Sequence, residues 1–255
     1  MKRIAIITGA TGGIGREFVR QVSGYELDEI WAIGRNEVKL KELSDTYGEK
    51  IVLVTADLSE ISGIEKVERM LAEQKPEVRF LINNAGVAKM AACQTFSQEE
   101  MIRTIDVNCK APVLLCNLCI PYMKQGSNIL NIASASAFQP NPYINLYAAS
   151  KAFERNYSRA LNVELEGTGI TVTAVCPGWV DTELLPKELN GKRVKYPGIV
   201  TVEKVVRTAL KDAEKKRDMS VCSLFVKCQH MNVKFMPQRL VMKIWTGAIK
   251  KYIRE

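Results

Sequence analysis

The chain has 255 residues, of which 47% are hydrophobic and 25% charged, and its formal net charge is +8. This composition excludes collagen-like, disordered and disulfide-stapled small proteins, and the length suffices for one large domain or two small ones. No apolar stretch approaches the roughly 20 residues that span a bilayer. Only four apolar residues precede Thr8 and Gly9, too few for a signal peptide. We therefore expect a cytoplasmic protein without a transmembrane segment.

The positive charge is concentrated near the carboxyl end. Residues 1–186 carry 19 Lys and Arg against 22 Asp and Glu, a net charge of −3, whereas residues 187–255 carry 17 against 6, a net charge of +11. A basic tail on a slightly acidic body, without a recognised nucleic-acid motif, argues against nucleic acid as a partner.

The seven cysteines lie mostly within apolar segments. Cys116 and Cys119 have the spacing of a redox or metal motif, but no second pair follows and His230 is the only histidine. We expect buried, reduced thiols and no metal site.

Short β-rich runs alternate with helical periods, which indicates parallel βαβ units. We expect strands at 4–8, 30–33, 51–55, 78–82, 128–133, 170–176 and 220–226, and helices at 14–23, 36–47, 61–74, 98–125, 146–166 and 201–217. Several of these strands are almost continuously apolar, as strands covered by helices on both faces are. The fold class is therefore α/β, with one doubly wound domain over residues 1–226 that includes a long loop at 179–200.

The first expected strand runs into the segment 8–15, Thr-Gly-Ala-Thr-Gly-Gly-Ile-Gly, and then into a helix. Glycines at 9, 13 and 15 allow a tight turn and let the backbone approach a pyrophosphate at the helix amino terminus. The spacing differs from the general G-x-G-x-x-G fingerprint, and such a segment can be only a turn. The strand before it and the helix after it favour dinucleotide binding.

A second group of polar residues follows other strand ends. Tyr147 and Lys151 lie one helical turn apart on the same face, which alone would describe an ordinary exposed pair. Ser134 stands 13 residues before the tyrosine at the end of one expected strand, and 83–86 (Asn-Asn-Ala-Gly) follow another. Since ligands bind outside the carboxyl ends of parallel strands, we expect these residues to line one crevice.

In these motifs the sequence resembles the short-chain dehydrogenase/reductase family over about residues 3–226. The joint order and spacing match at the glycine turn 8–15, Asp57 and Leu58, Asn83 to Gly86, Asn108, Ser134, Tyr147, Lys151, Pro177, Gly178 and Thr182. The resemblance implies a single Rossmann-like doubly wound domain with a seven-stranded parallel sheet and helices on both faces. It also implies assembly as a homodimer or homotetramer.

The resemblance further implies an oxidoreductase that interconverts a ketone or aldehyde and an alcohol. Tyr147 would be the general acid and base, and Lys151 would lower its pKa from about 10 and hold the nicotinamide ribose. Ser134 would hydrogen-bond the substrate oxygen, and Asn108 would position a water that relays protons. The alternative is a non-catalytic dinucleotide-sensing regulatory protein on the same fold.

By the same resemblance, the cofactor would be held from four sides. The contacts expected are Gly9, Thr11, Gly13, Ile14 and Gly15 at the turn; Asp57 and Leu58 at the adenine; Asn84, Ala85 and Gly86 beside the adenosine and ribose; and Pro177, Gly178, Val180 and Thr182 at the nicotinamide carboxamide. Two alternatives stay open, because Asp57 can serve only as a cap and Pro177-Gly178 only as a turn.

The residues after the second strand bear on the choice of dinucleotide. An NAD site usually has Asp or Glu there, whereas this chain has Gly34 followed by Arg35. A guanidinium binds a 2′-phosphate through two charge-assisted hydrogen bonds, so we expect NADP(H) in preference to NAD(H). Arg35 as a solvated loop residue is the alternative. Gly12 stands where some NADP-binding members carry a further basic residue.

The substrate pocket should be closed by 179–200 and lined by Phe138, Pro140 and Ile144, which suits a hydrophobic ketone, steroid, bile acid or acyl chain. Four cations in the closing segment are able to attract a carboxylate or phosphate tail, although we favour a solvated loop. They are Lys187, Lys192, Arg193 and Lys195.

Residues 227–255 are expected to be a basic amphipathic extension of the same domain. Within 238–255, apolar pairs repeat every four residues at Leu240/Val241, Ile244/Trp245, Ala248/Ile249 and Tyr252/Ile253, which predicts an amphipathic helix with a cationic polar face. We predict that it packs on protein, over the substrate mouth or on a neighbouring subunit. Peripheral contact with an anionic membrane is the alternative.

A subunit interface is expected on the helices of 98–125 and 146–166. The apolar residues concerned are Val113, Leu114, Leu118, Tyr122, Phe153 and Leu161. Core packing within one subunit would explain many of the same residues.

Overall fold

The computed structural model describes residues 1–183, 185, 188–189 and 192–249. In this part of the chain, seven parallel strands form the central sheet in the order β3-β2-β1-β4-β5-β6-β9. Their bounds are β1 (Arg3–Thr8), β2 (Glu29–Gly34), β3 (Ile51–Thr55), β4 (Glu77–Asn83), β5 (Asn128–Ile132), β6 (Thr171–Val175) and β9 (Met219–Ser220). The predicted α/β class and doubly wound parallel sheet are confirmed.

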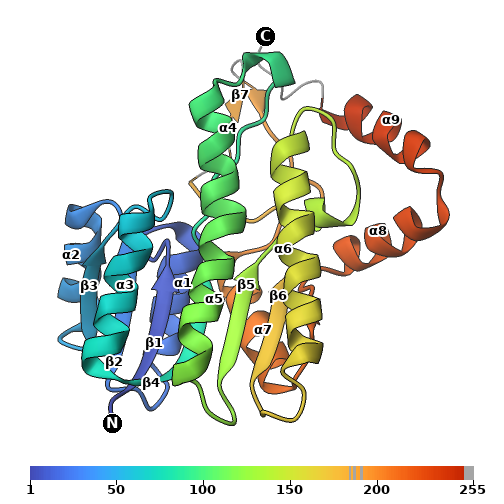
Figure 1. Cartoon of the computed structure of the whole chain (residues 1–255). Coiled ribbons are helices and arrows are strands. Elements are labelled where there is room, and N and C mark those ends of the chain that lie inside the picture. Colours follow the sequence, from blue (N-terminus) through green and yellow to red (C-terminus); the bar gives the residue numbers. More distant parts are fainter. Residues whose placement is uncertain (184, 186–187, 190–191, 250–255) are drawn as a thin grey trace.

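Helices cover both faces of the sheet (Figure 1). One face carries α1 (Gly13–Val22), α2 (Glu37–Tyr47) and α7 (Val202–Glu214), and the other carries α3 (Ile61–Gln74), α5 (Ala111–Cys119) and α6 (Asn145–Glu164). Alternate residues of β1 enter different cores: Ala5 and Ile7 pack with the first set of helices, Ile4 and Ile6 with the second. This two-sided burial explains the continuous apolar runs of the strands.

The single helix expected over 98–125 is wrong, because the segment changes helix type. It consists of α4 (Gln98–Ile105), a π-helical stretch η2 (Asp106–Lys110), α5 and a 3₁₀ turn η3 (Ile120–Tyr122). Pro112 lacks the N–H that an α-helix would donate to the carbonyl of Asn108 four residues earlier. The interruption therefore falls at a residue predicted to act in catalysis.

The seventh strand is shorter than the expected 220–226. The chain leaves the sheet after Ser220 and enters α8 (Leu224–Phe235). In a strand Leu224 and Val226 would share a face, but Leu224 is 76% exposed and Val226 only 1% exposed, as helical geometry requires. A short apolar run cannot be assigned to helix or strand by periodicity alone.

The carboxyl end forms a helical hairpin of α8 and α9 (Gln238–Ile249), which projects beside α6 at the right of Figure 1. In α9 the predicted apolar pairs separate. Val241 and Ile249 are buried, and Trp245 Nε1 donates to the carbonyl of Pro142 at 3.0 Å, whereas Leu240 and Ile244 are exposed. One residue of each described pair thus packs within the chain, and the expected place over the substrate mouth or on a neighbouring subunit stays a prediction. The last pair, Tyr252/Ile253, lies outside the described residues.

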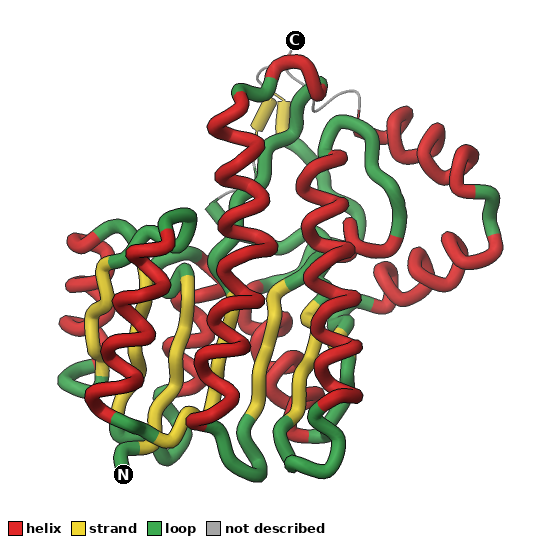
Figure 2. The backbone as a smooth tube through the Cα atoms, viewed as in Figure 1, coloured by secondary structure: helices red, strands yellow, loops and turns green. Residues whose placement is uncertain are grey.

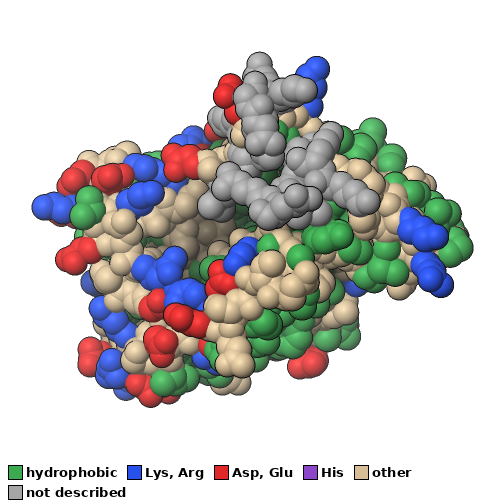
Figure 3. Space-filling view, turned by 90° about the horizontal axis from the view of Figure 1, so that it is seen from above, with side chains coloured by type: hydrophobic (Ala, Val, Ile, Leu, Met, Phe, Trp, Pro, Cys, Tyr) green, Lys and Arg blue, Asp and Glu red, His purple; other side chains and the backbone are tan. Residues whose placement is uncertain are grey.

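Helix α8 also has exposed apolar residues. Phe235 and Met231 are exposed, and the lobe at the right of Figure 3 shows hydrophobic side chains with Lys and Arg among them. From residue 219 to 254 the sequence has no Asp or Glu. Within the described residues, no helix is both long and apolar enough to cross a bilayer.

The segment 179–200 has more structure than the expected loop. A parallel bridge between Val180 and Val200 closes its base, and β7 (Glu188–Leu189) pairs antiparallel with β8 (Lys192–Arg193). Lys187 and the side chains of Lys192 and Arg193 lie outside the described part of the structure.

The cysteines divide into buried and exposed thiols. Cys116, Cys119 and Cys176 are buried as expected and Cys109 and Cys222 are half-buried, whereas the expectation is wrong for Cys93 and Cys228, which are exposed; all seven are free. Burial raises the pKa of Cys116 and of Cys176 to about 12, so both stay neutral thiols at physiological pH. The described residues contain no group of three or more His, Cys, Asp or Glu placed to hold a metal ion.

Candidate active site

The loops at the carboxyl edge of the sheet gather above the strands (Figure 2). Two of them, after β1 and β4, are tied together by hydrogen bonds. Asn84 Nδ2 donates to the carbonyls of Thr8 and Gly9 at 3.1 and 3.0 Å, and Thr8 Oγ1 accepts from the backbone N–H groups of Asn84 and Ala85 at 3.0 and 2.9 Å. Thr8 stood in the glycine motif but not among the predicted contacts. Its role is to fix the 84–86 loop.

The glycine turn is required by close backbone approaches. Gly9 has φ +60°, and a Cβ there would lie 2.9 Å from Ala85 Cα; a Cβ on Gly15 would lie 2.1 Å from the carbonyl oxygen of Gly9. Gly12, the N-cap of α1, has no capping side chain, and the first turn has no acidic residue. The free N–H groups of this helix end therefore suit a diphosphate.

Two further predicted contacts border this turn. A Cβ on Gly13 would lie 3.0 Å from Thr182 Cγ2, and one on Gly34 would lie 3.4 Å from Thr11 Cγ2. Arg35, directly after Gly34, is exposed and has no ion-pair partner among the described residues. The structure therefore brings Thr182 and the start of the Arg35 loop to the turn, while Ile14 packs against the core.

Asp57 and Leu58 after β3 serve the fold. The Asp57 carboxylate accepts from the backbone and hydroxyl of Ser59 at 3.0 and 2.7 Å and from Arg103 of α4 at 2.9 Å. Burial raises the pKa of Asp57, but the hydrogen bonds from Arg103 and Ser59 outweigh it and hold that pKa at about 2. Leu58 is buried in the core. Asp57 does not cap α3, whose N-cap Glu60 has no side-chain cap hydrogen bond; its contacts are a turn with Ser59 and an ion pair with Arg103, and the adenine role stays a prediction.

Asn108 is fully buried and holds the loop after β4. Its Oδ1 accepts from Val87 N at 2.9 Å, and its Nδ2 donates to the Val87 carbonyl at 2.9 Å and to Ser150 Oγ at 3.0 Å. Both amide N–H groups are thus used within the protein, and Ser150 is a partner that the sequence did not reveal.

Lys151 lies at the centre of the cluster. Its Nζ donates to the carbonyl of Ile132 at 2.6 Å and to Glu154 Oε2 at 2.7 Å, and it lies 5.9 Å from the centre of the Tyr147 ring. A Cβ on Gly86 would lie 3.4 Å from this Nζ and 3.5 Å from Asn108 Oδ1. Burial alone would lower the pKa of Lys151, but Glu154 and Tyr147 raise it above the usual range.

Ser134 lies two residues after the end of β5 and directly before η4, which packs against α6. Its Oγ accepts from Ser136 N at 3.1 Å and caps the 3₁₀ turn η4 (Ala135–Phe138). Ala135 N donates to the carbonyl of Pro177 at 2.7 Å, which joins this strand end to the next loop. Gly178 faces α8, since a Cβ there would lie 2.6 Å from Val226 Cγ2.

Aromatic residues cover this region, and Trp179 and Tyr196 among them were not singled out by the sequence analysis. The Trp179 ring lies 4.9 Å from that of Tyr196 and stacks on Trp245 of α9 at 6.5 Å. The Phe138 ring lies 3.9 Å from that of His230 on α8. Residues from η4, the 179–200 segment and the hairpin thus meet at the predicted substrate side.

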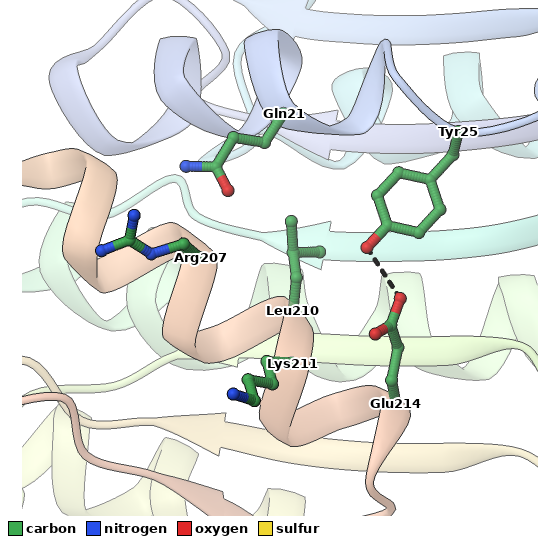
Figure 4. Close-up of a pocket in the computed structure, with 6 residues that line it drawn as sticks. All are labelled: Gln21, Tyr25, Arg207, Leu210, Lys211 and Glu214. Carbon is green, nitrogen blue, oxygen red and sulfur yellow. Dashed lines mark hydrogen bonds between the residues drawn. The ribbon is translucent and has the colours of Figure 1, made fainter.

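Two hollows lie elsewhere on the molecule. One, of about 390 Å³, is lined by residues of α1, the turn after it and α7, where Tyr25 donates to Glu214 at 2.8 Å (Figure 4). The other, of about 400 Å³, lies between Pro142 and α9. We assign neither to the chemistry, because the convergent polar groups lie above β1, β4 and β5.

Comparison with known proteins gives close parallels. The chain matches the family model of short chain dehydrogenases over residues 3–192. An uncharacterized oxidoreductase of Staphylococcus epidermidis is 31% identical over 196 residues, 76% of this chain and 85% of that protein. The NADP-dependent 3-hydroxy acid dehydrogenase YdfG of Escherichia coli is 33% identical over 184 residues, 69% of this chain and 72% of that protein.

Solved structures agree. A short-chain dehydrogenase from Sphingobium yanoikuyae in complex with NADPH has a TM-score of 0.76 and 26% identity, covering 92% of this chain and 97% of that one. A 7β-hydroxysteroid dehydrogenase has a TM-score of 0.82 at 23% identity, covering 95% and 96%, a likeness in fold. With the family model matching most of its length, this chain belongs to the short-chain dehydrogenase family of dinucleotide-dependent oxidoreductases.

Proposed function

We propose that this oxidoreductase is an NADP(H)-dependent carbonyl reductase or alcohol dehydrogenase, with Tyr147 as general acid and base. The observation that carries the proposal is the cluster around Lys151, whose Nζ lies 5.9 Å from the Tyr147 ring and beside Gly86 and Asn108. A positive charge near a phenol stabilises its anion, so it favours release of the phenol proton.

The residues divide the work as follows. When bound, the dinucleotide would supply the hydride in reduction or accept it in oxidation. In reduction the Tyr147 hydroxyl gives its proton to the carbonyl oxygen, and in oxidation its phenolate takes the proton of the alcohol. Ser134 hydrogen-bonds the same oxygen and orients it. Gly9, Gly13 and Gly15 leave room for the diphosphate at the amino end of α1, and Asn84 to Gly86, Pro177, Gly178, Val180 and Thr182 flank the remainder.

For Asn108 we propose a role for its backbone in place of its side chain. Both amide N–H groups of its side chain are used by Val87 and Ser150, so we assign a proton-relaying water to its backbone carbonyl. That carbonyl lies in the π-helical stretch, and Pro112 denies it the usual α-helical donor.

NADP(H) is preferred in this proposal because of Arg35. An exposed guanidinium next to the glycine turn, with Gly34 where a carboxylate would exclude phosphate, suits a 2′-phosphate. The relatives named as NADP-dependent and the neighbour solved with NADPH support the same choice.

For the substrate we propose a hydrophobic carbonyl or alcohol. Phe138, Ile144, Trp179 and Trp245 lie at the side where the strand ends open, and they offer apolar and aromatic surface. We favour a steroid-, bile-acid- or acyl-like molecule over a sugar.

For assembly we propose a homodimer or homotetramer through α4 and α6. Ile102, Ile105 and Phe153 are exposed on these helices, whereas Leu161 is buried in the subunit core, as the core-packing alternative has it. Light scattering at micromolar concentration tests this; a monomer contradicts it.

The test is an NADPH-oxidation screen against a panel of hydrophobic ketones. We expect turnover in the wild type, none in Tyr147→Phe, and almost equal NADPH affinity in both. A sensor on the same fold would bind NADPH without turning over any ketone. Substantial turnover by Tyr147→Phe would remove the assignment of Tyr147.

A further inference from the structure

A buried carboxylate lies directly behind the lysine of the cluster. Glu154, one turn after Lys151 on α6, is 1% exposed, and its Oε2 lies 2.7 Å from Lys151 Nζ, itself part of a residue only 4% exposed. Neither the family motif nor the sequence analysis singled out Glu154. It is nevertheless the nearest charge to the group that is proposed to activate Tyr147.

Among the described residues, Lys151 is the only charged group that acts on the Glu154 carboxylate. Three thiols face it from other elements: Cys109 of η2, Cys116 of α5 and Cys176 of β6. Burial raises their pKa values to about 11, 12 and 12, so they are neutral at physiological pH. The pair is therefore isolated from other charges.

A buried polar chain holds the backbone beneath the pair. Ser158 Oγ donates to the carbonyl of Glu154 at 2.6 Å and accepts from Asn131 Nδ2 at 2.8 Å, and Asn131 Oδ1 accepts from Asn83 Nδ2 at 2.8 Å. The chain runs from α6 through β5 to the end of β4. The position of Glu154 is thus fixed by the same strands that carry the site.

Stability alone does not call for this pair. Replacing a buried ion pair by apolar side chains of similar volume is often neutral or stabilising, because burial of both charges costs as much as their attraction returns. What the carboxylate changes is the charge of the site. A Lys–Glu pair is neutral as a unit, so Tyr147 feels a weaker positive field than from lysine alone.

The hydrogen bonds of Lys151 also support a role for Glu154 in the site. An ammonium group has three N–H donors. Ile132 and Glu154 take two of them, which leaves one for the side of Tyr147 and the cofactor. Glu154 therefore fixes both the orientation and the effective charge of the lysine.

We propose that Glu154 is a positioning residue that sets the pH at which Tyr147 exchanges its proton, by pairing with Lys151 as a carboxylate and releasing its charge when protonated. The proposal rests on the proposed function of Tyr147 and Lys151. In the reaction the proton still moves between the Tyr147 oxygen and the substrate oxygen; Glu154 exchanges its own proton with solvent.

The pKa of Glu154 lies close to physiological pH, so its protonation state changes in that range. Burial raises the pKa of Glu154 to about 7, and Lys151 offsets only part of the increase. Above neutral pH the carboxylate screens Lys151. Below it the protonated acid leaves the full lysine charge facing Tyr147, which favours the phenolate.

The experiment compares pH profiles of kcat/KM for alcohol oxidation in the wild type, Glu154→Gln and Glu154→Val. Both variants remove the negative charge, so the limb that reports Tyr147 should move down by about one pH unit. Glutamine keeps an acceptor for Lys151, so it should retain KM for the cofactor better than valine does. The wild type should show two ionisations in this range and the variants one.

Asp212→Asn is the matched control. Asp212 is also a buried carboxylate in an ion pair, with Arg217 at 2.7 Å, and it accepts a hydrogen bond from Ser220 Oγ at 2.7 Å, but it lies on α7 at the far edge of the sheet. Its replacement should lower stability without moving the profile. A profile that shifts equally in Asp212→Asn would overturn the proposal.

A second readout does not depend on turnover. Near-ultraviolet titration of the tyrosines, with Tyr147→Phe to assign the signal, should give a lower pKa for Tyr147 in Glu154→Gln than in the wild type. If no substrate is turned over but this shift appears, the proposed function fails and the role of Glu154 stands. An unshifted limb and an unshifted titration overturn it. If both variants fail to fold, the wild-type pH profile alone tests the proposal, and a single ionisation in that profile would overturn it.

Discussion

The first strand–turn–helix and the last helical hairpin are built on opposite principles. In the turn after β1, glycines are forced by backbone contacts as short as the 2.1 Å that a Cβ on Gly15 would make with Gly9. In the hairpin, a Cβ on Gly247 would meet nothing within 4 Å, and α9 leaves Leu240 and Ile244 uncovered. Several positions of the turn accept only glycine, whereas the hairpin requires only that apolar residues recur at helical spacing.

This difference teaches where sequence carries mechanism. Where only glycine fits, another part of the protein or a ligand must approach the backbone closely, so the residue type gives direct information about that site. An apolar repeat states only that some face is covered, by the same chain, another copy or lipid. The following experiments either break that contrast or make it sharper.

The largest effect is expected in the turn itself. Gly15→Ala must displace the carbonyl of Gly9, so it should lower the free energy of unfolding by about 2–3 kcal/mol and abolish the gain in Tm that NADPH gives. Gly12→Ala is the control, since its nearest neighbour would lie at 3.7 Å. Thermal melts with and without NADPH measure both. Equal Tm values and equal NADPH effects in the two variants would show that close backbone contacts do not require glycine at position 15.

Arg35 is expected to give the next largest effect. Arg35→Ala removes the cation assigned to the 2′-phosphate, so KM for NADPH should rise about 10- to 100-fold while KM for NADH stays nearly constant. Initial rates with the two cofactors measure this. More efficient use of NADH than of NADPH by the wild type would reverse the assignment.

Deleting 238–255 is expected to have a moderate effect. Loss of Trp245 and of its bond to Pro142 should lower stability and raise KM for a hydrophobic ketone several-fold in detergent-free buffer. Sedimentation with anionic liposomes distinguishes packing on protein from contact with a membrane. If the wild type sediments and the truncated chain stays in solution with full activity, the hairpin is a membrane contact.

The smallest effect is expected at Gly247. Its replacement by alanine meets open space in α9 and should stabilise that helix by about 0.5–1 kcal/mol without changing kinetics. Differential scanning calorimetry is sensitive enough. A destabilised Gly247→Ala would mean that this face of α9 is covered in the assembled protein.

The sheet and most helices could be predicted because their signals are local. Ile4 to Ile7 read as a strand covered on both sides, and they are divided between two cores. The interruption at Asp106–Lys110 and the start of α8 were missed for a physical reason. Pro112 is compatible with the first turn of a helix, and a run such as Leu224 to Val226 has no period to separate helix from strand.

In the site, the expected residues above β1, β4 and β5 come together, but their partners could not be foreseen. Asn108, Lys151 and Asp57 are each held by residues far away in the sequence, namely Ser150, Ile132 and Arg103. Chain order shows that a polar residue is present, and only packing shows which of its atoms are already used. Whether the predicted residues act as assigned is for the variants above to decide.

The approach of Thr182 to Gly13, where a Cβ would come within 3.0 Å, joins two ligands thermodynamically. Gly13 belongs to the turn assigned to the cofactor, and Thr182 lies within the segment that the Val180–Val200 bridge closes at its base and that is predicted to cover the substrate. Any free energy by which the dinucleotide fixes Thr182 is returned as tighter substrate binding, and reciprocity demands the same factor in the other direction. The dinucleotide and the substrate should therefore bind with positive cooperativity, each lowering the Kd of the other by the same factor.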